Sequence, residues 1–305
     1  MKSRPRTAAS TPLVQPQPRF QHTIARAAVV EGFGFWSSRD VRVEFRPAQP
    51  NTGVVFVRGD LNPAVRIPAA VERRIETPRR TALVHGAGRV EMVEHILASL
   101  AGLQIDNCEV WVNESEMPGC DGSSLAFVEA LEAAGIVRQQ AIRATLVVRE
   151  TVRLGNEESW ILANPPEQPG LALQFRIEYP HCPSIGRQTY KLAITPNSFR
   201  KQLASCRTFL TRQEAEWLRS QKLASRATTK EALVFDADGP VDNELRFDDE
   251  CVRHKMLDLV GDLALAGCDI VGQVAAHCSG HRLNAELVRV LLAEGEKLQP
   301  WLRCA

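Results

Sequence analysis

The chain has 305 residues, and its charges nearly cancel: 37 Lys and Arg stand against 36 Asp and Glu, for a formal net charge of +1. A chain of this length can bury one large core or two ordinary ones, and it lacks the basic excess of a nucleic-acid binder, so we expect no nucleic-acid partner. It has neither the long apolar stretch of a membrane span nor the start of a secretory signal, so we expect a cytoplasmic protein without a membrane span.

The eight cysteines are spread along the chain without a Cys-x-x-Cys pair or a tight cluster. This pattern indicates neither a disulfide framework nor a cysteine-rich zinc site. Any metal must therefore be held by histidines and carboxylates.

The sequence of the first half predicts a definite order of strands and helices. Residues 1–20 are rich in proline and polar side chains and have no apolar period, so we expect a disordered arm. Alternating apolar residues predict strands at 41–45 and 54–57, joined as a hairpin across the break at 47–53. A helical apolar period then runs from 94 to 102, followed by a strand at 108–112, a glycine turn and a helix at 125–134.

The second half repeats this order. Strands at 160–163 and 171–177 predict a second hairpin, a helical period runs from His254 to 267, and a strand at 270–275 leads through a glycine turn to a helix at 283–293. Gly122 follows His95 by 27 residues, and Gly280 follows His254 by 26. We therefore predict an α+β fold of two similar domains, 21–142 and 143–305, each a small mixed β-sheet with a two-helix layer. The helices of both would pack together around a metal site.

His254 and Asp258 are spaced i, i+4, so they project from one face of a helix, and Asp262 extends that face by one turn. A solvated face is the ordinary interpretation of such charges. Here, however, most other positions of the helix are apolar, which predicts burial, and a buried charge is costly unless it is paired or binds a metal. Glu94 and His95 stand in a similar apolar run of the first half.

Two such helices facing each other would bring His95 opposite His254 and Asp258. Two imidazoles and one carboxylate suit Zn²⁺ with a fourth position left to water. Glu94 points about 100° round the helix from His95, so it could act on that water as general base without binding the metal. The same ligand set serves non-haem iron oxygenases, but on barrel strands with His-x-Asp spacing. Fe²⁺ could also occupy the same pocket.

Several stretches resemble UDP-3-O-acyl-N-acetylglucosamine deacetylases, the zinc enzymes of the committed step of lipid A synthesis. They are 93–107, 118 with 121–123, 207–209, 245–247 with 253–262, and 279–281 with 283–284. The resemblance extends over residues 22 to 300. It implies that zinc-dependent hydrolysis removes the acetyl group of a UDP-linked acylated glucosamine substrate, and we expect the chain to act as a monomer.

The resemblance also implies roles for nine side chains. The metal ligands are His95, His254 and Asp258, the catalytic residues are Glu94, Thr208, Asp262 and His281, and the substrate contacts are Phe209 and Lys255. In this interpretation Glu94 is the base, and Thr208 helps to hold the oxyanion. His281 is the cationic general acid beside the leaving amine. Asp262 orients the His281 ring and favours its protonated form.

Two segments depart from the family pattern. Residues 34–38 read Gly-Phe-Trp-Ser-Ser where the family commonly has Gly-Leu-His, then Ser or Thr and Gly, and residues 226–232 replace a Gly-Gly-Ser loop. Both segments belong to the substrate and acyl-chain side in the family. Two alternatives therefore stay open: a divergent paralogue that deacylates a different N-acyl sugar, and a catalytically silent sugar-nucleotide-binding protein. Retention of the base, the acid and the oxyanion residue argues against the second.

Overall fold

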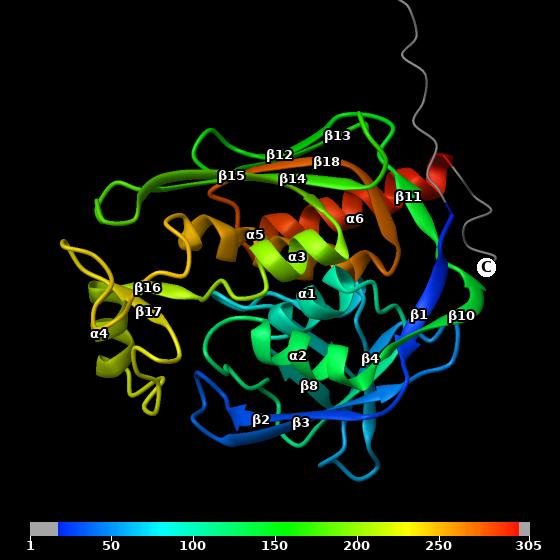
Figure 1. The fold of residues 1–305 in the computed structure, drawn as a ribbon, viewed down its shortest axis with the longest axis horizontal. Helices are drawn as coiled ribbons and strands as arrows, with labels where there is room; N and C mark the ends of the chain where they lie inside the picture. Colours follow the sequence, from blue (N-terminus) through cyan, green and yellow to red (C-terminus); the bar gives the residue numbers. More distant parts are fainter. Residues whose placement is uncertain (1–17, 299–305) are drawn as a thin grey trace, which may run out of the picture.

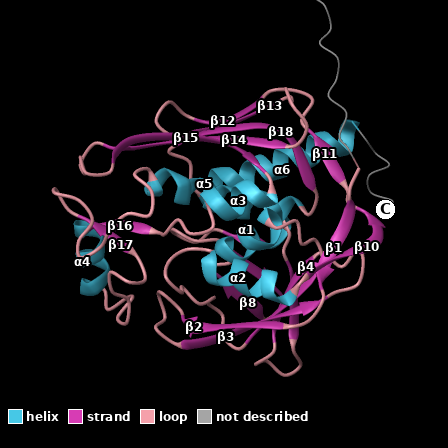
Figure 2. Cartoon of the chain, viewed as in Figure 1, coloured by secondary structure: helices cyan, strands magenta, loops and turns pink. Residues whose placement is uncertain are grey.

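The computed structural model describes residues 18–298 and shows two outer β-sheets with helices packed between them (Figure 1). Helices and strands are both well represented, which confirms the predicted α+β class, and six α-helices lie within this described range (Figure 2). None of these helices is long and apolar enough to cross a membrane.

The first half forms a five-stranded sheet and a smaller one. The five strands, in spatial order, are β2 (Ala28–Phe33), β3 (Asp40–Pro47), β9 (Cys108–Val112), β4 (Val54–Arg58) and β5 (Val65–Pro68). The smaller sheet contains β6 (Arg74–Ile75), β7 (Ala82–His85) and β8 (Gly88–Glu91). Helices α1 (Glu94–Gly102) and α2 (Leu125–Ala134) lie on the inner side, where the ring of Phe127 packs edge-on against Phe45 at a centroid distance of 6.2 Å.

The second half forms a six-stranded sheet. Its main path is β12 (Val152–Gly155), β13 (Trp160–Asn164), β18 (Asp269–His277), β14 (Leu171–Tyr179) and β15 (Gly186–Ile194), and β11 (Thr145–Val147) pairs with β18. On its inner side lie the helices α3 (Pro196–Gln202), α5 (Glu250–Leu263) and α6 (His281–Leu298). A small lobe at one end of the molecule holds β16 (Phe209–Thr211), α4 (Arg212–Ser220) and β17 (Leu233–Phe235).

The two large sheets share one strand pattern. The order β2-β3-β9-β4-β5 matches β12-β13-β18-β14-β15, and each central strand is antiparallel to one neighbour and parallel to the other. Strands β1 (Phe20–Ile24) and β10 (Ile136–Ile142) pair with each other at the side of the molecule. The division of the chain after residue 142 stays a prediction.

The two predicted hairpins are wrong, although their strands exist. Strand β9 lies between β3 and β4, and β18 lies between β13 and β14. The observed hairpin partners of these strands are β2, β5, β12 and β15. Neighbouring strands lie about 4.8 Å apart, so the break at 47–53 is long enough to step over one inserted strand. The inserted strands begin 50 residues after β4 ends and 90 residues after β14 ends, so they leave no local signal in the sequences of the predicted hairpins.

The element boundaries agree with the sequence in some places and differ in others. Helix α1, helix α2 and strand β9 begin and end where the sequence predicts. Helix α5 begins at Glu250, so His254 lies one turn inside the helix and does not open it. Residues 1–17 of the predicted arm lie outside the described residues. The end of that arm belongs to the fold, because Phe20 begins β1 and Arg19 pairs with Asp106 and Asp269 at 2.7 and 2.6 Å.

Helices α1 and α5 are buried on almost every side, and one core cluster extends through both halves. The apolar residues of both helices belong to this cluster. The two helices come very near each other at Gly261, where a Cβ atom would lie 2.1 Å from the carbonyl oxygen of Glu94. Only glycine lets α5 come this near to α1 without moving the backbone. This contact sets the distance between the side chains of the two helices.

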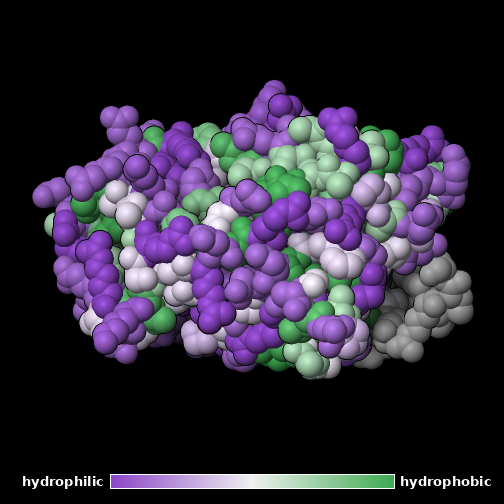
Figure 3. All heavy atoms as spheres, turned by 90° about the horizontal axis from the view of Figure 1, so that it is seen from below, coloured by the Kyte–Doolittle hydropathy of each residue, from purple (hydrophilic) through white to green (hydrophobic). Residues whose placement is uncertain are grey.

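One face of the molecule is mostly polar (Figure 3). Figure 3, seen from below, shows hydrophilic residues over much of this face with hydrophobic residues in small groups. Strand β3 illustrates the cause, since its residues alternate between buried and more exposed positions over most of its length.

Candidate metal centre and active site

Three potential metal ligands converge where α1 meets α5. His95 lies in the first turn of α1, and His254 and Asp258 lie one turn apart on α5. Their ligand atoms all lie within 4.8 Å of one another, and all three residues are buried. Each histidine Nε2 is 3.5 Å from Asp258 Oδ1, and the two rings are nearly perpendicular with centroids 5.2 Å apart. The structure therefore brings together the three residues that the sequence singled out.

The protonation of this group suits a divalent cation. His254 Nδ1 lies 3.1 Å from the carbonyl oxygen of Cys206, which leaves Nε2 free to bind a metal. Burial lowers the pKa of His254 to about 4, so the ring is neutral at physiological pH. Burial alone would raise the pKa of Asp258, but His254 and Lys255 hold it well below its usual range. Two imidazoles and one ionised carboxylate fit a zinc ion with room for a further ligand.

Glu94 lies beside the ligand group without belonging to it. It is the first residue of α1, only 3% exposed, and its Oε2 accepts a hydrogen bond of 3.0 Å from the backbone N–H of Thr81. Burial raises the pKa of Glu94, which moves a carboxylate toward the range useful for accepting a proton near neutral pH.

His281 and Asp262 form a hydrogen-bonded imidazole–carboxylate pair at the same site. His281 is the first residue of α6, and its Nδ1 lies 2.8 Å from Oδ2 of Asp262, which is fully buried. Burial by itself lowers the pKa of His281, but the Asp262 carboxylate overcomes this effect and raises it to about 9. The imidazole is therefore charged at neutral pH. Asp262 Oδ2 also accepts a hydrogen bond of 2.8 Å from Asn284 Nδ2.

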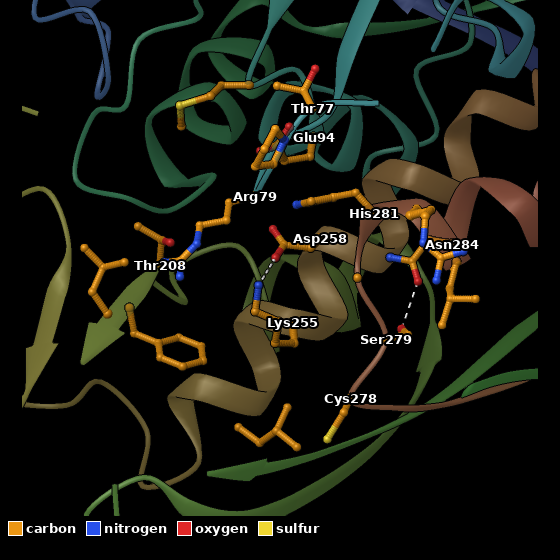
Figure 4. Close-up of a pocket in the computed structure, with 18 of the residues that line it drawn as sticks. Thr77, Arg79, Glu94, Thr208, Lys255, Asp258, Cys278, Ser279, His281 and Asn284 are labelled. Atoms are coloured by element: carbon orange, nitrogen blue, oxygen red, sulfur yellow. Dashed lines mark hydrogen bonds and ion pairs between the residues drawn. The ribbon is translucent and has the colours of Figure 1, made fainter. Parts of the chain in front are cut away.

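Most of these residues line one cavity of about 530 Å³ (Figure 4). Seven of the nine matched residues line it, whereas His254 and Asp262 lie behind the wall. Thr208 is fixed by backbone hydrogen bonds to Gly122 and Leu233. Lys255 Nζ binds Asp258 Oδ2 at 2.8 Å and lies 5.8 Å from the centre of the Phe209 ring. All nine residues thus gather around one site.

The cavity also has wall residues that sequence reasoning missed. Arg79 and Glu214 form an ion pair of 2.9 Å, which joins the segment before β7 to α4. Sequence reasoning also missed Thr81, which does not line the cavity but is fully buried and contacts both Glu94 and Asp262. Neither segment has a motif that would mark it. Asn284 could have been found, because it follows His281 by three residues on one helix and so shares its face.

The two segments that depart from the family pattern meet in space. Phe35 and Ala232 pack in one apolar cluster with Leu218 and Ala224, and Trp36 and Ala227 lie against it. Both carboxylate oxygens of Glu116 accept hydrogen bonds from the backbone N–H groups of Trp36 and Ser37, at 2.7 and 2.8 Å. Because Phe35 and Trp36 line the cavity, this cluster forms part of its wall.

Comparison with known proteins gives a consistent result. The family model described as UDP-3-O-acyl N-acetylglycosamine deacetylase matches residues 21–293. A UDP-3-O-acyl-N-acetylglucosamine deacetylase of Haemophilus influenzae (strain 86-028NP) is 41% identical over 281 residues, covering 90% of this chain and 91% of that protein. The protein of the same name from Shewanella sp. (strain ANA-3) is 39% identical over 279 residues, covering 90% of each chain.

A buried His–His–Asp group beside a separate carboxylate and a charged imidazole is the arrangement of a metal-dependent hydrolase. The chain belongs to the UDP-3-O-acyl-N-acetylglucosamine deacetylase family. It is a deacetylase of lipid A biosynthesis, and its family is zinc-dependent.

Proposed function

We propose that this chain hydrolyses the acetamide of UDP-3-O-acyl-N-acetylglucosamine, with His95, His254 and Asp258 as the zinc ligands. The observation that carries the proposal is the convergence of these three buried ligand atoms between a hydrogen-bonded base and a hydrogen-bonded acid. When bound there, Zn²⁺ would polarise the acetamide carbonyl and lower the pKa of water toward ~7. Fe²⁺ fits the same ligand set.

Glu94 is the proposed general base. Its Oε2 is held by the N–H of Thr81, so the other carboxylate oxygen is available to take a proton from the attacking water. The buried position limits hydration of the carboxylate and raises its proton affinity. Thr208 lines the same cavity and is fixed by its backbone hydrogen bonds, and it would donate its hydroxyl hydrogen to the oxyanion that forms on the carbonyl.

His281 is the proposed general acid. Asp262 holds Nδ1, which leaves Nε2 to donate a proton to the departing amine nitrogen. Loss of an amine as a neutral molecule requires this proton, because an amide anion is a very poor leaving group. Phe209 and Lys255 line the same cavity and would contact the sugar nucleotide.

The alternative functions differ in what they need from this site. A silent binding protein needs neither the proton relay at Asp262 and His281 nor the buried base, and both are present with short hydrogen bonds. A paralogue with another acyl substrate remains compatible with the altered wall near Trp36. We also infer two related halves, 21–142 and 143–305, on the strength of their matching strand order. The cytoplasmic location stays a prediction.

We expect one tightly bound divalent metal per chain, because the described residues present a single group with this ligand geometry. The test is to measure acetate release from the UDP-linked substrate by the purified protein, before and after chelation, together with its metal content. Activity should disappear on chelation and return when one equivalent of Zn²⁺ is added. Active protein with no metal, or with two metals per chain, would contradict the ligand assignment.

Trp36→Ala should change the preference for acyl-chain length. Removal of the indole enlarges the cavity beside Trp36 and Phe35. We therefore expect kcat/KM for substrates with longer 3-O-acyl chains to rise about 10-fold relative to kcat/KM for substrates with shorter ones. The measurement is kcat/KM for substrates that differ only in acyl length. Trp217→Ala removes an exposed indole that does not line the cavity and serves as control. An unchanged length profile in Trp36→Ala would place the acyl chain elsewhere.

A further inference from the structure

Thr81 uses all three of its polar groups at the junction of the two halves. It is fully buried and directly precedes β7. Its carbonyl oxygen accepts a hydrogen bond of 3.4 Å from Val93 N–H, just before α1. Its own N–H donates to Glu94 Oε2 at 3.0 Å, and its hydroxyl donates to Asp262 Oδ1 at 2.6 Å. One residue therefore contacts the start of α1 through its backbone and α5 through its side chain.

These hydrogen bonds connect the proposed general base with the proposed general acid. The path runs from Glu94 through Thr81 to Asp262, and from Asp262 to His281. Asp262 Oδ2 is already shared by His281 and Asn284, and the hydroxyl of Thr81 binds the other oxygen. Without that hydroxyl, a fully buried carboxylate oxygen would lose its donor, which favours rotation of the carboxylate.

We propose that Thr81 is a positioning residue that holds the base Glu94 and the acid His281 in a fixed relation across the interface between the halves. The proposal rests on the roles of Glu94 and His281 given above. Thr81 does not border the cavity, so it acts through Glu94 and Asp262 and not on the substrate. A proton must leave the water on one side and reach nitrogen on the other, so a small rotation of either group lowers turnover.

A purely structural role makes a different prediction. The close contact at Gly261 already joins α1 to α5, and a buried threonine could simply add one hydrogen bond to that packing. Its loss would then lower the melting temperature and leave turnover per metal-loaded site unchanged. The hydroxyl of Thr23 offers a matched case, since it is also buried and donates to the carbonyl oxygen of Asn107 at 2.7 Å, outside the cavity.

The experiment compares Thr81→Val, Thr81→Ser and Thr81→Ala with Thr23→Val in the full-length zinc-loaded protein. Valine keeps the shape of threonine without its hydroxyl, and serine differs from alanine by one oxygen atom. We expect kcat to fall about 10- to 100-fold in Thr81→Val, with KM and metal content unchanged. Serine should recover most of the loss, and alanine should not. If the valine variant does not fold, the ratio of the serine to the alanine variant provides the same test.

The outcomes separate this proposal from the proposed function. Near-normal kcat in Thr81→Val, equal kcat in the serine and alanine variants, or an equal loss in Thr23→Val would overturn the positioning role. Glu94→Gln and His281→Gln are measured in parallel. If those two variants retain full turnover, the base and acid assignments fail. If they lose turnover while Thr81→Val does not, only the role of Thr81 fails.

Discussion

Glu94→Gln is expected to lower kcat by about 10²- to 10⁴-fold while the protein keeps its metal. Glutamine preserves the size of the side chain and the acceptor for Thr81 N–H, but it cannot take a proton from water. Metal content should stay near that of the wild type, because Glu94 lies outside the group formed by His95, His254 and Asp258. The measurements are steady-state turnover and elemental analysis of the same preparation.

His254→Ala is the matching variant on the ligand side. It removes one of the two imidazoles, so both metal and turnover should be lost. The contrast between the two variants distinguishes a base, whose replacement spares the metal, from a ligand, whose replacement removes it. Loss of metal from Glu94→Gln would show that these roles have been assigned incorrectly.

Asp262→Asn is expected to move the alkaline limb of the pH profile to lower pH. The Asp262 carboxylate holds the pKa of His281 at about 9, so the imidazole remains a proton donor up to that pH. Without the Asp262 carboxylate, burial weighs more heavily, so the pKa of His281 should fall toward the ordinary histidine value of ~6.5. Activity at pH 8 should then drop strongly, whereas activity at lower pH should suffer less.

The profile of kcat/KM against pH measures this shift in the free enzyme. His281→Gln provides the reference, because a variant without the imidazole should lose this alkaline limb together with most of its turnover. Arg282→Gln changes the next residue, which is exposed and paired with Glu286, and should leave the limb in place. An unchanged limb in Asp262→Asn would mean that His281 does not set it.

The candidate metal ligands and the neighbouring Glu94 could be predicted because their signals are local. The i, i+4 spacing of His254 and Asp258 places both on one face of α5 whatever surrounds the helix, and the apolar residues between them indicate burial. The pair Glu94 and His95 at the start of α1 follows the same reasoning. The prediction of the hairpins was wrong because it depends on a distant part of the chain. Strands β3 and β4 are separated by β9, which comes much later in the sequence.

The sequence alone determined the α+β class and the two segments that depart from the family pattern, and it predicted the nine residues that the structure gathers around one cavity. These conclusions need only periodicity, spacing and matched motifs. The tertiary structure decided the insertion of β9 and β18 between neighbouring strands, the meeting of Phe35 with Ala232, and the bridge through Thr81. It also decided the charge of His281, because the pKa depends on burial and on a carboxylate 2.8 Å away in space. Contacts between distant residues follow from the packing of whole elements, so no local pattern encodes them.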